Sequence, residues 1–447
     1  MAILPVTSPE ALAVRYAAGV LGCATSFIPN RGSDEYLHAF LADVGPDVLV
    51  VFPETAAAAP AAIAGGLVPS ALSLGPVAGI DVDLLAAARS MPSEPIAGRA
   101  DPQDLWALIS SGGTTGKSKA SRRSFAAYDQ MIDVGPTPRR RQLVCSPLAY
   151  VSQVLTDQVI AGGGLVVFRD RLDPAEVLRT IEAERITHLG LVEPGLVDLI
   201  DHPDLPHRDL SSLVAITHIG ASAPSNLRRR LLERAGPVLA HPYGASEAGI
   251  VSMLAAPEYD LSHPELLETA GRPLPGVQVR IVSEAGSDAS PGDEGEIVVR
   301  SAAAADGYDV TPARSGFQNG EYHTGDLGLI DERGYLHVRG RAQDARIIDD
   351  HKVMPIDVAN ALCAHPNVRY AVAIPMGPQD AGFGAMVVTA PEASVTAGEL
   401  KSYVAVPHGA HVAPEVIALV QRIPTTDQGK PDRTRIIPAL AAARSTG

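Results

Sequence analysis

The stretch SSGGTTGKSK, from Ser110 to Lys119, decides how this chain is interpreted. Hydroxyl side chains alternate with glycines, so backbone amides and the hydroxyls of Thr114 and Thr115 can surround phosphate oxygens. The apolar run from Leu105 to Ile109 precedes the stretch and predicts a strand that ends in this loop. The spacing differs from that of the standard P-loop, and a flexible surface turn is the alternative interpretation.

Lysine is rare in this chain. There are five lysines against thirty-one arginines, and Lys117 and Lys119 both lie in the glycine-rich loop. Another, Lys430, ends the segment PTTDQGK. A lysine carries a compact point charge that a planar guanidinium does not replace, so lysines kept in an arginine-rich chain predict phosphate or reaction-centre sites. Chance retention beside glycines is the alternative.

Length and charge limit the class of protein. The 447 residues exceed the size at which one core keeps growing, so we expect two or three domains. A net charge of -15 argues against nucleic-acid and membrane partners. The three cysteines are too few and too widely spaced for a disulfide framework or a zinc cluster, which fits a reducing cytoplasm. The first residues do not resemble a secretory signal.

The apolar patterns predict an α/β fold. Short apolar runs alternate with helical patterns through the first three hundred residues, which is typical of βα units in largely parallel sheets. Helices are predicted from Ser8 to Leu21, from Ser33 to Val44, and from Asp173 to about Arg185. The uncharged stretch from Ala56 to Ile80 contains three prolines, so we expect irregular surface chain there.

The sequence pattern changes at about residue 271 and again at about residue 341. Short alternating strands separated by Gly, Pro and Asp turns predict a β-rich subdomain at about residues 271–340. A compact α+β pattern fills residues 341–447. We therefore expect a large domain over residues 1–340, a small C-terminal domain over residues 341–447, and a hinge at about residues 340–344.

Six segments together resemble the signatures of the adenylate-forming (AMP-binding) superfamily, in the order found in acyl-CoA synthetases and acyl-AMP ligases. They are TTGKSK (114–119), GASAP (220–224), YGASE (243–247), YHTGD (322–326), GRAQD (340–344) and PTTDQGK (424–430). The resemblance implies a large N-terminal domain of mixed βα-layered sheets with a β-rich subdomain, followed by a small mobile α+β lid that rotates about the hinge.

The resemblance also implies a reaction. A carboxylic acid would react with ATP, with Mg²⁺ present, to give an acyl-adenylate and pyrophosphate, and the acyl group would pass to CoA. Two anions must meet, so the protein supplies positive charge and positioning. The alternatives are transfer to the thiol of an acyl carrier protein or to an amine, and a retired homologue that binds a nucleotide without turnover.

Individual residues take their implied roles from their place in these signatures. Lys430 would bridge the carboxylate and the α-phosphate, Glu247 would bind Mg²⁺, and Asp326 would accept hydrogen bonds from the ribose. Ser246 joins Lys430 and Glu247 in the catalytic set. The remaining nucleotide-binding residues are Ser111, Gly112, Gly113, Thr114, Thr115, Gly116, Lys119, Gly220, Ala221, Ser222, Tyr243 and Arg341. The acid pocket would include Tyr150, Val192, His218 and Gly244, and the hinge Gln343. A buried, hydrogen-bonded histidine is the alternative for His218.

Three features depart from the family's pattern. The run AYVSQ (149–153) lacks the aspartate that binds an α-ammonium in amino-acid-activating relatives, which favours a simple carboxylic acid. Asp350 stands where thioester-forming relatives usually have glycine, so a carboxylate would narrow the path of CoA and repel its phosphates. The chain begins at a strand that relatives reach later, and a homodimer is one way to cover the edge this leaves.

Overall fold

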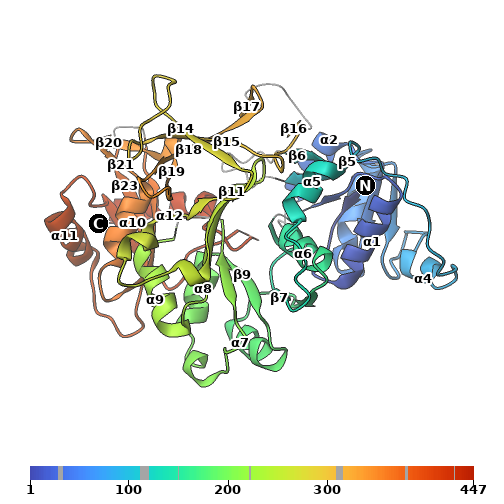
Figure 1. The fold of residues 1–447 in the computed structure, drawn as a ribbon. Helices are drawn as coiled ribbons and strands as arrows, with labels where there is room; N and C mark the ends of the chain where they lie inside the picture. Colours follow the sequence, from blue (N-terminus) through green and yellow to red (C-terminus); the bar gives the residue numbers. More distant parts are fainter. Residues whose placement is uncertain are drawn as a thin grey trace. The chain divides into compact units, whose positions relative to one another are not determined.

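Contacts divide the protein into two compact units, which are described separately. Unit 1 contains residues 1–172, 245–249 and 300–322, and unit 2 contains residues 173–244, 250–299 and 323–447. The structure is a computed structural model that describes residues 1–28, 34–110, 120–149, 151–220, 223–308, 316–377, 381–426 and 428–446. Its elements are labelled in Figure 1. The hinge at residues 340–344 stays a prediction.

Unit 1 begins with a parallel four-stranded sheet. Its strands are β1 (Ala2–Ile3), β2 (Ser26–Phe27), β3 (Val48–Val51) and β4 (Ser70–Ser73), in the order β2-β1-β3-β4. Parallel neighbours need a crossover connection, and helices supply it. These helices are α1 (Pro9–Val20), α2 (Asp34–Val44) and α3 (Ala59–Ala64). Ile3, Leu49 and Val50 are fully buried, so the sheet forms one of the cores.

Two predicted helices begin as the sequence indicates. The Ser8 hydroxyl accepts a hydrogen bond from the amide of Ala11, and Pro9 is the first residue of α1. In unit 2, the Asp173 carboxylate accepts one from the amide of Glu176 and caps α7 (Pro174–Ala183). Sequence alone therefore located the starts of both helices.

The prediction for residues 56–80 was wrong in part. Helix α3 and strand β4 lie in this stretch, and Ala59, Ala62 and Val68 are buried. Pro60 lies in the first turn of α3, where its missing N–H has no partner to lose. The alanines are small enough to pack closely, so an uncharged, proline-containing stretch became part of the core.

The rest of unit 1 contains a second, antiparallel sheet and a further pair of parallel strands. Strands β5 (Leu105–Ser110), β6 (Ala120–Ser124) and β16 (Gly307–Tyr308) form an antiparallel sheet, while β7 (Arg141–Val144) pairs in parallel with β8 (Leu165–Phe168). The predicted strand before the loop is confirmed by β5. The remaining elements are α4 (Leu84–Ala88), α5 (Phe125–Ile132), α6 (Val151–Ala161) and β17 (Phe317–Gln318).

Unit 2 is built on a second sheet. Strands β9 (His188–Leu191), β10 (Ala215–His218) and β11 (Leu239–Ala245) are parallel neighbours, followed by β12 (Gly249–Leu254) and β13 (Arg272–Pro273), which are antiparallel to each other. Helices α7, α8 (Glu193–Ile200) and α9 (Ser225–Ala235) connect the parallel strands. Ligands of such sheets bind beyond the carboxyl ends of the strands, so the residues after β9, β10 and β11 are the first place to search for a site.

The β-rich and C-terminal parts of unit 2 follow in sequence. The β-rich part has β14 (Gln278–Val282), β15 (Gly295–Arg300), β18 (Glu321–Ile330) and β19 (Leu336–Arg341). The C-terminal part packs α10 (Pro355–Cys363) and α11 (Ala397–His408) with β22 (Val368–Pro375), β23 (Phe383–Thr389) and β24 (Val416–Leu419). A hairpin of β20 (Arg346–Ile348) and β21 (His351–Val353) precedes it, and α12 (Arg433–Thr446) ends it.

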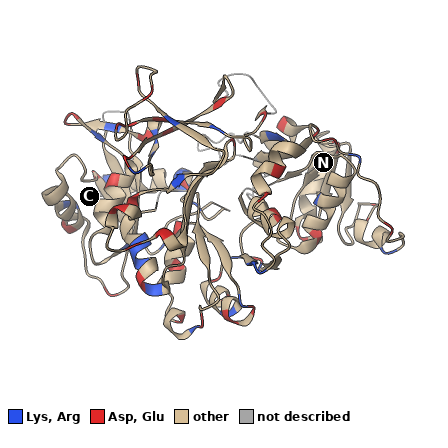
Figure 2. Ribbon diagram, in the orientation of Figure 1, with Lys and Arg blue, Asp and Glu red and all other residues tan. Residues whose placement is uncertain are grey.

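Charged segments of both signs are interspersed over each unit, as Figure 2 shows. Within the described ranges, every helix is too short or too polar to cross a bilayer.

One buried ion pair organises unit 1. The Asp157 carboxylate on α6 accepts hydrogen bonds from Arg15 (2.5 Å), Tyr16 (2.5 Å) and Tyr128 (2.6 Å). The guanidinium of Arg15 also lies over the ring of Trp106, 4.6 Å from its centroid. Arg15 and Asp157 are 1% and 3% exposed, so each depends on the other for charge compensation.

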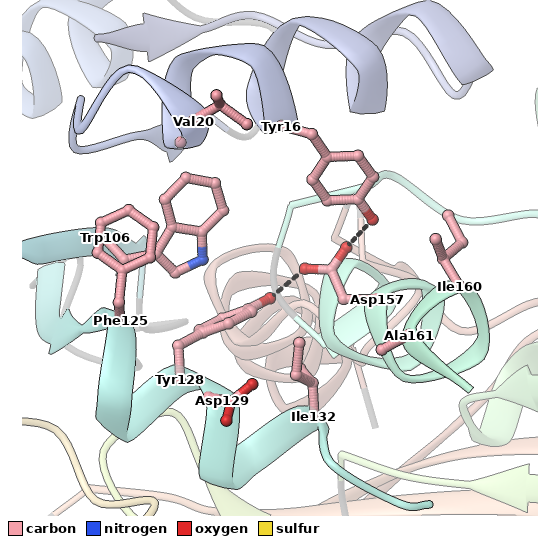
Figure 3. A pocket seen from close by; sticks show the side chains of 11 residues that line it. Tyr16, Val20, Trp106, Phe125, Tyr128, Asp129, Ile132, Asp157, Ile160 and Ala161 are labelled. Atoms are coloured by element: carbon pink, nitrogen blue, oxygen red, sulfur yellow. Dashed lines mark hydrogen bonds between the residues drawn. The ribbon is translucent and has the colours of Figure 1, made fainter. Parts of the chain in front are cut away.

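An apolar pocket of about 470 Å³ opens beside this network (Figure 3). Val20, Trp106, Phe125, Ile132 and Ile160 contribute to its walls, and Asp157 lies at its polar end. Because the Asp157 carboxylate already accepts three hydrogen bonds, the pocket offers mainly apolar surface.

Replacing Asp157 should destabilise unit 1. In Asp157→Asn, the buried guanidinium of Arg15 loses its counter-charge, and we expect the free energy of unfolding to fall by about 3–5 kcal/mol. Urea unfolding measures the change. Asp129→Asn is the matched control, because Asp129 lines the same pocket but is exposed, and a change within about 0.5 kcal/mol is expected. Equal stability of Asp157→Asn and the wild type would contradict the assigned role.

Candidate active site

The side chain of Lys430 lies on the backbone of Gly220, within unit 2. A Cβ placed on Gly220 would lie 2.7 Å from Cε and 3.3 Å from Nζ of Lys430. Gly220 lies two residues after the end of β10 and has a φ of 111°, which residues with a side chain rarely adopt. The structure therefore brings together two predicted site residues that are far apart in sequence, and only glycine at position 220 leaves room for the ammonium.

The turn that carries Lys430 is itself closely packed. Gly429 has a φ of 79°, and a Cβ there would lie 2.8 Å from Cγ2 of Val192. Val192 also lies near Gly220, because a Cβ added to Gly220 would lie 3.5 Å from Cγ1 of Val192. Val192 connects β9 to α8, so the Gly429-Lys430 turn is seated on the loops that follow two neighbouring parallel strands. This is the edge at which such sheets bind ligands.

A second cluster places three of the predicted nucleotide-binding side chains. The Tyr243 hydroxyl donates a 2.6 Å hydrogen bond to Oδ2 of Asp326, and Nε of Arg341 lies 3.1 Å from Oδ1. Burial and the adjacent Asp326 raise the pKa of Tyr243 well above its usual value, so Tyr243 remains a donor. Arg341 also donates to the carbonyl of Thr324 (2.7 Å). Asp326 is thus held as a carboxylate with fixed orientation.

Local structure explains why these residues meet. Asp326 and Arg341 are directly opposite on the antiparallel strands β18 and β19, so their side chains share one face. Gly325 has a φ of 70°, and its amide donates a 3.0 Å hydrogen bond to Glu296. The Thr324 hydroxyl accepts from the amide of Asp326 and donates to the carbonyl of Ile297. Hydrogen bonds within the YHTGD segment and to the neighbouring strand β15 therefore fix its conformation.

The predicted metal ligand Glu247 belongs to unit 1. It is 8% exposed, and its carbonyl accepts a hydrogen bond from the amide of Ala305 (2.7 Å). Burial lowers the pKa of the nearby Arg123 to about 10, although the charge of Glu247 among others opposes this. The carbonyl of Ser246 accepts from the Ser121 hydroxyl (3.2 Å).

The donors around Glu247 fit magnesium better than a cage-forming metal. Among the described residues, no group of three or more His, Cys, Asp or Glu side chains could hold a metal ion. Mg²⁺ usually takes one or two carboxylates from the protein and fills its shell with water and substrate phosphates. A single buried carboxylate is therefore a suitable donor set when the phosphates of a nucleotide provide the rest.

Several predicted site residues lie outside the described residues. They are Ser111, Gly112, Gly113, Thr114, Thr115, Gly116, Lys119, Tyr150, Ala221 and Ser222. Their roles stay predictions.

The remaining predicted residues are all described. His218 ends β10, is 0% exposed and hydrogen bonds to His241, whereas Val192 is half-buried and Gly244 is exposed. Gln343 is exposed in the short turn after β19, and its carbonyl accepts from Arg346 (3.2 Å). The next residue, Asp344, forms a bidentate pair with Arg433 of α12. The pocket and hinge roles are unchanged as predictions.

Sequence reasoning missed a row of buried polar residues behind Gly220. Glu193, Arg228 and His241 are 1%, 4% and 5% exposed, and none belongs to a family signature. The available signal was a charged residue directly after an apolar strand, Glu193 after β9. Because its partners come from separate segments, that signal did not identify them.

The C-terminal part of unit 2 is fixed to α8 and α9 by ion pairs. Asp201 accepts from Arg230 of α9 and from Arg369 of β22 (2.6 Å to Nε), and Asp198 lies 3.3 Å from Arg422. Burial raises the pKa of Asp201, but the hydrogen bonds from Arg230 and Arg369 outweigh it, so the pKa is lowered. Their stabilisation is present above the usual aspartate pKa and is lost as pH falls through the lowered value.

Known proteins resemble this chain along most of its length. The family described as AMP-binding enzyme matches residues 1–309. The medium/long-chain-fatty-acid–CoA ligase FadD8 of Mycobacterium tuberculosis is 33% identical over 391 residues, covering 82% of this chain and 67% of that protein. A feruloyl-CoA synthase of Amycolatopsis sp is 29% identical over 451 residues, covering 96% and 86%. The solved amide bond synthetase McbA of Marinactinospora thermotolerans is 32% identical with a TM-score of 0.87, covering 98% and 89%.

A side chain at position 220 should displace the lysine. In Gly220→Ala, the added methyl would overlap Cε of Lys430, and we expect acyl-adenylate formation to fall about 10²-fold, as when a well-placed group is shifted by about 1 Å. ATP–pyrophosphate exchange measures this step.

Gly276→Ala is the matched control for backbone strain. Gly276 also has a positive φ, of 81°, but an added Cβ meets nothing within 4 Å. Both variants should lose about 1–2 kcal/mol of stability, and only Gly220→Ala should lose exchange activity. Equal exchange rates in the two variants would show that Lys430 does not depend on the space above Gly220.

Proposed function

Because the chain belongs to the AMP-binding enzyme family, we propose that Lys430, Asp326 and Glu247 carry out its reaction. The protein is an AMP-forming acid ligase that activates a carboxylic acid as an acyl-adenylate, releases pyrophosphate and transfers the acyl group to CoA. In the first step the acid's carboxylate oxygen bonds to the α-phosphorus and the bond to pyrophosphate breaks. In the second step the CoA sulfur bonds to the acyl carbon, and AMP leaves as the thiol loses its proton.

The position of Lys430 on Gly220 is the observation that carries this proposal. Two anions react in the first step, so an ammonium between them lowers their repulsion and stabilises the charge that develops at phosphorus. Lysine suits this task because its three donors can contact the carboxylate and a phosphate oxygen together. The glycine backbone beneath it admits the reacting groups closely.

Asp326 is the proposed ribose ligand. One of its oxygens accepts from Tyr243 and the other lies beside Arg341, so the carboxylate is oriented before the nucleotide binds. A carboxylate has about four lone-pair sites, which leaves capacity for the ribose hydroxyls. Tyr243 supplies a flat ring for the adenine and Arg341 a positive charge near the sugar or phosphates.

Glu247 is the proposed ligand of Mg²⁺, which neutralises phosphate charge when bound. The buried Arg123 near it provides a positive charge on the same side of unit 1.

The proposed substrate is an apolar carboxylic acid without an α-ammonium. Residues 149–153 contain no acidic side chain to bind one. The names of the similar proteins agree in class, since they describe ligases of fatty acids, ferulate and indoleacetate. We also propose a cytoplasmic location, which fits the free thiols of Cys23, Cys145 and Cys363.

The proposed lid movement uses the segment around Gln343 as its pivot. The ion pairs of Asp198 and Asp201 with the C-terminal part describe the pose with Lys430 inside the site. In a rotation to a second, CoA-accepting pose, the exposed Asp198–Arg422 pair would cost little to release, whereas the largely buried pairs of Asp201 would favour the closed pose.

An amine or a carrier-protein thiol is the alternative acceptor, and Asp350 is the observation that favours it. Asp349 and Asp350 form the two-residue turn of the β20–β21 hairpin with φ values of 49° and 63°. Such turns need positive φ, which aspartate tolerates better than most residues. The geometry of the turn explains why a small polar residue stands at position 350. The exposed carboxylate of Asp350 would still repel the phosphates of CoA. Similarity to an amide bond synthetase agrees with an amine.

Removing the ammonium tests the role of Lys430. Lys430→Ala should lower acid-dependent ATP–pyrophosphate exchange by about 10²–10³-fold, since a charge that stabilises the transition state is lost. Octanoate, ferulate, indole-3-acetate and 2-succinylbenzoate form the test panel. Full exchange in this variant would contradict the role, and the absence of wild-type exchange with every acid would argue for a retired nucleotide-binding homologue.

Asp350→Gly separates the acceptors. Loss of the carboxylate should lower the KM for CoA several-fold, because about one unit of negative charge no longer repels the CoA phosphates. Pyrophosphate exchange should be unchanged. Asp349→Gly is the matched control in the same turn. Salt should reduce the difference between the two variants. An unchanged KM for CoA in Asp350→Gly would place the CoA phosphates away from this hairpin.

A further inference from the structure

A row of buried polar side chains runs beneath the carboxyl ends of three parallel strands in unit 2. Nη2 of Arg228 lies 2.7 Å from Nε2 of His241, whose Nδ1 lies 2.8 Å from Nδ1 of His218. Nε2 of His218 lies 3.0 Å from Oε1 of Glu193. The four residues are between 0% and 5% exposed. Burying four polar side chains costs free energy unless they interact with one another, which suggests that the row has a function.

Arg228 sets the direction in which the hydrogen bonds of this row run. A guanidinium only donates, so Nε2 of His241 accepts and its proton lies on Nδ1. Burial, followed by the charge of Arg228, holds the pKa of His241 well below its usual value, which keeps that ring neutral. Nδ1 of His241 then donates to Nδ1 of His218, and the proton of His218 lies on Nε2, facing Glu193. The row therefore presents a donor to the carboxylate.

Glu193 is the anionic end of this row. Burial raises the pKa of Glu193, but the adjacent His218, with further contributions that include Lys430, outweighs it and lowers the pKa, so the group is a carboxylate. His218 approaches this buried carboxylate with Nε2 3.0 Å from Oε1. A buried carboxylate in this state requires a nearby cation.

The lysine turn supplies that cation from the other side. Val192 directly precedes Glu193 and packs against Gly429, while Lys430 lies on Gly220, two residues after His218. Glu193 and His218 thus flank the floor on which the ammonium rests. Arg228 does not contact Glu193 directly, because it donates hydrogen bonds to His241 and to the carbonyl of Thr269 (2.7 Å).

We infer that Glu193 is a positioning residue for Lys430: the row Arg228–His241–His218 fixes its carboxylate, and the carboxylate holds the ammonium above Gly220 while the lid is closed. This inference rests on the proposed role of Lys430. The attraction between the two charges keeps the lysine over the site, where the substrate carboxylate and the α-phosphate would meet it. When the lid rotates, the attraction is lost and Lys430 leaves with its turn.

A double-mutant cycle with Lys430 tests the inference. Glu193→Gln keeps the shape and an oxygen that faces His218 but removes the charge. With the panel acid that gives the fastest wild-type exchange, we expect ATP–pyrophosphate exchange to fall about 10–100-fold. In the Lys430→Ala background the same substitution should have no further effect, because coupled residues are not additive.

The second half-reaction provides a readout that a merely structural role would change. Transfer from pre-formed acyl-adenylate to CoA takes place with Lys430 out of the site, so Glu193→Gln should keep this rate within about twofold. Glu182→Gln is the matched control, since it removes a carboxylate of unit 2 whose ion pair with Arg208 is partly exposed. It should change exchange by less than about twofold.

The outcomes separate the two claims. Full exchange in Lys430→Ala would overturn the proposed role of the lysine, and with it this inference. A defective Lys430→Ala beside a fully active Glu193→Gln would overturn the inference alone, as would an equal loss from Glu193→Gln in both backgrounds. If Glu193→Gln fails to fold, Glu193→Asp replaces it in the cycle. Its shortened side chain should lower exchange only where Lys430 is present, and any other pattern would contradict the positioning role.

Discussion

The close packing of one lysine on one glycine is the constraint on which the rest of the site depends. Lys430 can rest above Gly220 only because neither Gly220 nor Gly429 carries a side chain, and because Val192 fills the space beside both. The three segments are separated by up to 238 residues in the sequence, yet they meet at the carboxyl edge of one parallel sheet. That edge is where an α/β sheet accepts a ligand.

The electrostatic arrangement follows from the reaction's anions. In the proposed site, ATP and a carboxylate would bring negative charge to the edge, and Lys430 and Arg341 would supply positive charge from unit 2. Each cation has a carboxylate nearby: Arg341 pairs with Asp326, and Glu193 lies in the electrostatic range of Lys430. Buried partners of this kind fix geometry more than they add stability. The site is therefore oriented before its substrates arrive.

Sequence alone predicted the fold class because its signals depend on residues that are close together in the chain, and the ligand-binding segments stay a proposal drawn from the same kind of signal. The caps at Ser8 and Asp173 and the strand before the glycine-rich loop depend on residues close together in the chain, and the structure confirms them. Residues 56–80 were harder, because alanine and proline permit either a surface loop or a packed helix, and tertiary contacts decide between them. The Glu193 row could not be predicted, since its four members come from separate segments and only burial makes their pairing necessary.

A crystal structure with a non-hydrolysable acyl-adenylate analogue tests the central claim most directly. The account predicts Nζ of Lys430 at about 3 Å from the group that replaces the α-phosphate, with the ribose hydroxyls on Asp326 and the acyl carbonyl above Gly220. An analogue bound with Lys430 facing solvent, or bound away from the carboxyl edge of β9, β10 and β11, would contradict it.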